Sequence, residues 1–68
     1  MTGEENELSM VQRHVSAGAA LVARQRELLV RLQADGQPTD QAQTLLNNFE
    51  DIQREHEAHL ARIIRERS

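Results

Sequence analysis

The strongest constraint on the fold is a pair of helical repeats separated by one short break. Residues 8–32 and 42–63 each carry mainly apolar or small side chains at alternating steps of three and four. This spacing is the a/d pattern of helices that pack along their length, and strand-like alternation is absent. Gly36 and Pro38 lie between the repeats and favour a helix end there. The chain is therefore predicted to be all-α, an antiparallel two-helix hairpin of coiled-coil type.

The break sets the predicted limits of the two helices. The signals for starting and ending helices predict a first helix over about residues 4–35, a turn at 36–38 and a second helix over about 39–66. The length of 68 residues leaves room for a single unit, so residues 1–68 are treated as one hairpin.

Individual residues are expected to cap these helices. Gly36 can take the left-handed conformation that closes a helix, and Thr39 can cap the next one. At the start of the chain two caps compete. Thr2 with Glu5 forms a capping box, whereas Asn6 would begin the helix a turn later.

The apolar repeats predict which residues face one another. In the first helix the seam is expected to contain Leu8, Val11, Val15, Gly18, Val22, Gln25, Leu29 and Leu32, with Leu21 and Leu28 widening it. In the second helix it is expected to contain Ala42, Leu45, Phe49, Ile52, His56, His59 and Ile63, with Leu46 and Leu60 on the flank. A turn near Gly36 would place His56 over Gly18 and Phe49 opposite Gln25.

The small size of the chain predicts self-association. Two helices bury one stripe each, and the sequence has no Cys that would form a disulfide. We therefore expect a homodimeric four-helix bundle, with another helical protein as the alternative partner. The expected interface comprises Leu8, Val11, Val15, Gly18, Leu21, Val22, Leu28, Leu29, Leu32, Leu45, Leu46, Phe49, Ile52, His56, Leu60 and Ile63.

Composition argues against several classes of function. A chain this short seldom builds both a core and a concave site, and no Ser/His/Asp set is apparent, so no enzymatic activity is expected. The net charge of −3 argues against nucleic acid as a partner. The run from Ala17 to Ala23 is far shorter than the ~20 residues that span a bilayer. A cytoplasmic protein with no cofactor is expected.

The three histidines offer a different function. His56 and His59 lie three residues apart, and His14 is expected on the same flank at a similar height. Imidazoles at this spacing can bind Zn or Ni, so a metal-binding or metal-sensing bundle is the alternative function. His56 packing over Gly18 would be purely structural. A third interpretation is a pH-sensitive interface, because a charged histidine in the seam would weaken packing.

The sequence also resembles a group of short proteins from alphaproteobacteria, rhizobial ones in particular. The resemblance covers about residues 11–63. It rests on Arg13-His14-Val15, Gly18 and Val22-Ala23-Arg24-Gln25-Arg26 in the first half, and on Ala34-Asp35-Gly36, Thr39, Ala42, Leu45-Leu46, Phe49-Glu50, His56 and His59 in the second. It implies a short helical hairpin in a bacterial cytoplasm and no particular activity.

Overall fold

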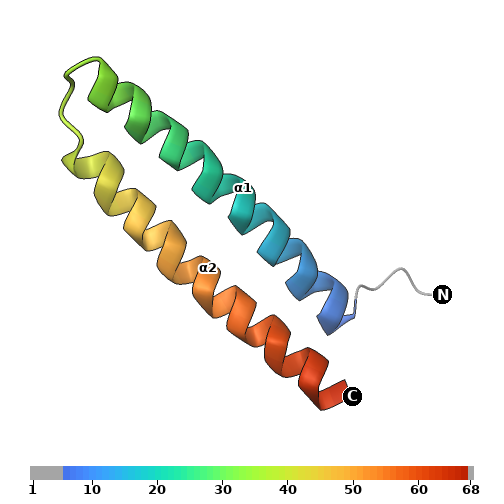
Figure 1. The fold of residues 1–68 in the computed structure, drawn as a ribbon. Coiled ribbons are helices and arrows are strands. Elements are labelled where there is room, and N and C mark those ends of the chain that lie inside the picture. Colours follow the sequence, from blue (N-terminus) through green and yellow to red (C-terminus); the bar gives the residue numbers. More distant parts are fainter. Residues whose placement is uncertain (1–5, 68) are drawn as a thin grey trace.

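A computed structural model describes residues 6–67 as two long helices side by side (Figure 1). Helix α1 spans Glu7–Ala34 and helix α2 spans Asp40–Arg67. The connection lies at one end of the pair, and the start of α1 and the end of α2 lie together at the other end. The two helices pack against each other along their length, and residues 6–67 contain no strand, which confirms the predicted all-α hairpin. Within this part of the chain, neither helix is apolar enough over a sufficient length to cross a bilayer.

The start of α1 is capped by Asn6. Its side-chain oxygen accepts a hydrogen bond from the backbone N–H of Ser9 at 2.8 Å. This bond satisfies one of the N–H groups that a helix leaves without an internal partner at its first turn. The competing capping box of Thr2 and Glu5 lies outside the described residues.

The end of α1 is closed by a glycine motif. Gly36 has a φ of 70°, as its place in the sequence predicted. Its N–H donates to the carbonyl of Gln33 at 3.2 Å, and the N–H of Gln37 donates to the carbonyl of Leu32 at 2.9 Å. These two bonds form a Schellman motif, which satisfies carbonyl groups that the last turn leaves open. The chain then reaches α2, where the carbonyl of Thr39 accepts a bond from the N–H of Gln43 at 2.8 Å.

The core is a narrow seam between the helices. Its buried apolar residues are Val11, Val22, Leu29, Ala42, Leu46 and Ile63. Leu32 and Phe49 are half-buried and pack against the part of this core nearest the turn. The eight residues expected on the seam of the first helix are all buried or half-buried.

The predicted seam of α2 was wrong at two of its positions. Leu45 and Ile52, which were expected on the seam, are 43% and 49% exposed. Leu46 and Gln53, their neighbours in the sequence, are buried at 6% and 8% exposed. Leu60, expected on the flank, is half-buried on the seam. Two three-four patterns overlap in this helix and share half of their positions, so periodicity alone cannot separate them.

Two buried glutamines bridge the helices. The Gln25 amide donates to the carbonyl of Ala42 at 3.0 Å, and the Gln53 amide donates to the carbonyl of Val15 at 2.8 Å. The first bond runs from α1 to α2 and the second from α2 to α1. Because they lie at different heights along the hairpin, together they oppose sliding of one helix along the other.

Gly18 provides the space for one of these bridges. A Cβ atom on Gly18 would lie 1.8 Å from the Oε1 atom of Gln53, so the side chain of Gln53 occupies that position. The expectation that His56 fills this gap was wrong. The error follows from the displaced seam of α2, which places Gln53 among the buried residues. The Gln25 amide, expected opposite Phe49, donates to the carbonyl of Ala42.

Candidate interaction surface

One long side of the hairpin carries an apolar groove between the helices. Its lining includes Ala17 and Leu21 from α1, with Phe49 and Ile52 from α2. The groove has a volume of about 200 Å³ and is open to solvent. Leu21 and Ile52 remain largely exposed although they stand beside the core.

The apolar side extends beyond this groove toward the turn. Leu28 lies one heptad after Leu21 on α1, and Leu45 lies one heptad before Ile52 on α2. Residues a heptad apart share a helix face, so these two leucines continue the same side toward the turn. Both are exposed. We call the surface of Leu21, Leu28, Leu45, Phe49 and Ile52 the apolar face.

Placing the flanking residues on one side removes a conflict in the sequence pattern. In the first helix, Leu21 and Leu28 widen the apolar stripe on one side. The predicted seam of the second helix placed its extra apolar residues at Leu46 and Leu60, which would lie on the opposite side of an antiparallel pair. With Leu46 and Leu60 on the seam, the exposed apolar residues of α2 become Leu45 and Ile52. Ile52 then lines the same groove as Leu21. The apolar widening of both helices therefore falls on a single side.

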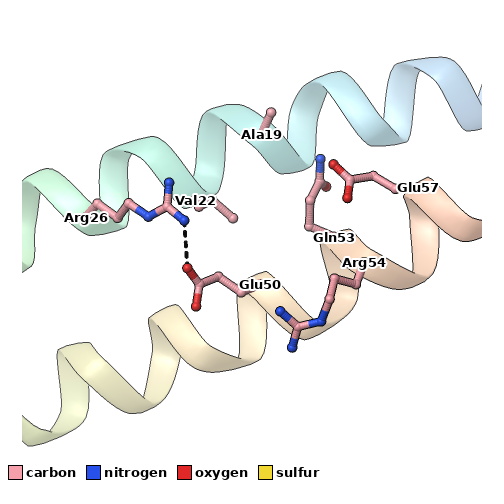
Figure 2. A pocket seen from close by; sticks show the side chains of 7 residues that line it. All are labelled: Ala19, Val22, Arg26, Glu50, Gln53, Arg54 and Glu57. Atoms are coloured by element: carbon pink, nitrogen blue, oxygen red, sulfur yellow. Dashed lines mark hydrogen bonds and ion pairs between the residues drawn. The ribbon is translucent and has the colours of Figure 1, made fainter.

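The opposite long side is polar (Figure 2). Arg26 of α1 and Glu50 of α2 form an ion pair across the helices at 2.8 Å. Glu57 extends from α2 beside Gln53, and both reach toward α1, whereas Arg54 points away from it. Arg54 forms an ion pair with Asp51 of its own helix. We call the surface of Ala19, Arg26, Glu50, Arg54 and Glu57 the charged face.

The histidines lie toward the open end of the hairpin, as a pair and a single residue. The rings of His14 and His56 face across the helices with centroids 5.3 Å apart and planes tilted by 34°. Both rings line the end of the apolar groove. His59 lies about one turn beyond His56 on α2, with its Nε2 atom 3.8 Å from a carboxylate oxygen of Glu7. Within residues 6–67, no group of three or more metal-binding side chains comes together.

Two buried nitrogen or oxygen atoms near the groove have no hydrogen-bond partner among the described residues. They are the Nδ1 atom of His56 and the Oε1 atom of Gln53. A buried polar atom without a hydrogen-bond partner lowers the stability of the fold. The packing around these two side chains must offset that loss. His56 is therefore held in place by packing and by the neighbouring ring of His14.

Sequence reasoning missed Gln53 and the Arg26–Glu50 pair. The signal for Gln53 is that Leu46 and Leu60 lie one heptad to either side of it, so a seam through those leucines also passes through Gln53. The cross-helix ion pair becomes visible only when the correct seam places Arg26 and Glu50 on the same flank.

Comparisons of this chain with protein-family models, with curated proteins and with solved structures find no match. The resemblance to short alphaproteobacterial proteins therefore stays an expectation. The interpretation of function rests on the geometry of the two faces.

Proposed function

We propose that this protein is a non-enzymatic interaction or regulatory module that acts by helix-on-helix packing in the cytoplasm. Its first partner is a second copy of the same hairpin, which would complete a four-helix bundle. The observation that carries this proposal is the apolar face, where Leu21 and Ile52 flank a groove that is almost entirely apolar.

The alternative partner is an amphipathic helix of another protein. Helices bind apolar grooves by laying one apolar stripe into them, and the apolar face offers such a groove along its axis. The same residues would serve in both cases. The two partners are distinguished by whether the purified chain associates with itself.

A matched pair of substitutions tests the proposal. Ile52 and Ile64 lie on the same helix and are both 49% exposed. Ile52 lines the apolar groove, whereas Ile64 lies one heptad after Glu57 of the charged face. Introducing Glu at either position adds a charge to a half-exposed site, so the cost to the hairpin itself should be similar.

The expected result is a difference in association. Ile52→Glu should halve the mass measured by light scattering, because it places a carboxylate in an apolar contact. Ile64→Glu should leave the mass of the dimer unchanged. Equal behaviour of the two variants would contradict the assignment of the apolar face as the interaction surface. Circular dichroism of both variants checks that the helices are retained.

A metal-binding bundle is the second candidate, supported by the close pair of His14 and His56. Imidazoles are common ligands of zinc, and His14 and His56 place two of them close together. The third, His59, lies beside Glu7 instead. Titration of the metal-free protein with zinc or nickel tests this function. We expect no binding tighter than about 10 μM. Tighter binding that is lost in His56→Ala would replace the interaction module with a metal-binding one.

A further inference from the structure

The apolar face is not uniform along the hairpin. Leu28 and Leu45 lie toward the turn, and Leu21 and Ile52 lie near the middle. At the open end the same flank carries Glu7 and His59, whose side chains approach to 3.8 Å. The face is therefore apolar in the half that contains the turn and polar in the half that contains the chain ends.

The surface area of the chain is consistent with a second copy on this face. The chain as a whole exposes 5208 Å², whereas a compact protein of 7.7 kDa exposes about 4,300 Å². The excess is of the same order as the ~800 Å² that each partner buries in an interface of standard size. Part of it follows from the elongated shape of two helices, and a second copy would cover the apolar part.

Two hairpins can stack face to face by a twofold axis in two ways. If the axis runs along the helices, both turns lie at the same end and α1 covers the partner's α2. If the axis runs across the helices, the turns lie at opposite ends and each helix covers its own counterpart. Both arrangements are closed, so the dimer does not extend into a fibre.

The uneven pattern of the face favours the first arrangement. With the turns at the same end, Leu28 of one copy lies at the height of Leu45 in the partner, and Leu21 lies at the height of Ile52. The polar ends then also meet, with the acidic Glu7 near the height of Arg62 in the other copy. With the turns at opposite ends and the hairpins fully overlapped, Leu28 would lie near the height of His14 in the partner, and Leu45 near that of Arg62, so leucines would meet polar residues.

We propose that a second copy of this chain covers the apolar face with both turns at the same end, so that α1 of each copy packs on α2 of the other. This inference rests on the proposed function, in which a second copy is the first partner, and adds the orientation of that copy. It also brings the His14–His56 pairs of the two copies to the same height in the interface.

Distances between single spin labels test the orientation. The sequence contains no Cys, so Gln37→Cys in the turn and Arg65→Cys near the chain end each provide one labelling site per copy. Both residues are exposed. Gln37 contributes a backbone bond to the turn, which the substitution leaves in place.

With the turns at the same end, each variant should give a label–label distance of roughly 30 Å or less, because packed helix axes are about 10 Å apart. With the turns at opposite ends, the distance between Gln37 labels should approach the ~42 Å length of a 28-residue helix. Long distances in a particle of dimeric mass would overturn the orientation and leave the proposed interaction intact. The mass of a single chain would overturn the self-association on which both depend.

Discussion

The two long sides of the hairpin lie between the same two helices and differ in how they meet solvent. On the charged face, Arg26 and Glu50 pair across the helices and present charge to water. On the apolar face, Leu21 and Ile52 leave hydrocarbon exposed beside a groove. The charged face is complete as it stands, whereas the apolar face gains free energy only when something covers it.

The difference arises from positions that are equivalent in the two helices. In each helix the positions beside the seam on the charged face hold mainly charged or polar residues. The positions beside the seam on the apolar face include Leu or Ile. A hairpin designed only to stand alone would carry polar residues on both flanks. The exposed apolar residues of the second flank therefore support the proposed association.

The largest expected effect is a difference in the free energy of unfolding between a variant of the seam and a variant of the apolar face. Leu46→Ala should lower the free energy of unfolding by about 2–4 kcal/mol, because it empties a buried position. Leu45→Ala should cost less than about 1 kcal/mol in dilute protein, because that side chain is already half in water. Urea denaturation followed by circular dichroism compares the two variants. Equal losses would mean that the seam of α2 passes through Leu45 after all.

A second experiment examines the seam where the two faces meet. Gly18→Ala should lower the free energy of unfolding by about 0.5–1 kcal/mol, because Gln53 must leave its place and lose its bond to the carbonyl of Val15. In the Gln53→Ala background the space is empty, so Gly18→Ala should then stabilise the helix by a similar amount. Thermal and urea unfolding of the four proteins measure this coupling. Additive effects would show that Gln53 does not fill the space over Gly18.

The smallest effect is expected on the charged face. Arg26→Ala removes an exposed ion pair, so the free energy of unfolding should fall by less than about 1 kcal/mol. The loss should shrink further in high salt, because exposed charges are screened. Light scattering of this variant should show the same mass as the wild type. A fall in mass would move the interaction surface to the charged face.

The hairpin could be predicted from the sequence because several independent signals agree. Both repeats have the helical period, and Gly36 with Pro38 allows only a short connection between them. The left-handed Gly36 follows from the same break. The seam of α1 was also accessible, since a single three-four pattern fits that helix.

Periodicity alone could not identify the seam of α2, and the position of the apolar face depends on that seam. Leu45 with Ile52 and Leu46 with Leu60 fit the helical period equally well. The contact of Gln53 with Gly18 distinguishes the two patterns. The long side chain of Gln53 fills the space that Gly18, which has no side chain, leaves open. Such a fit belongs to the two helices together, and the pattern of either helix alone does not contain it.

The absolute mass of the wild-type chain in solution, measured at neutral pH with a chelator present, shows whether two copies associate. Light scattering with refractive-index detection suits the chain, which has no Trp or Tyr to absorb near 280 nm. A mass of twice 7.7 kDa is predicted, because the proposed second copy would cover the apolar face. A mass of 7.7 kDa that persists at high concentration would mean that no second copy covers the apolar face.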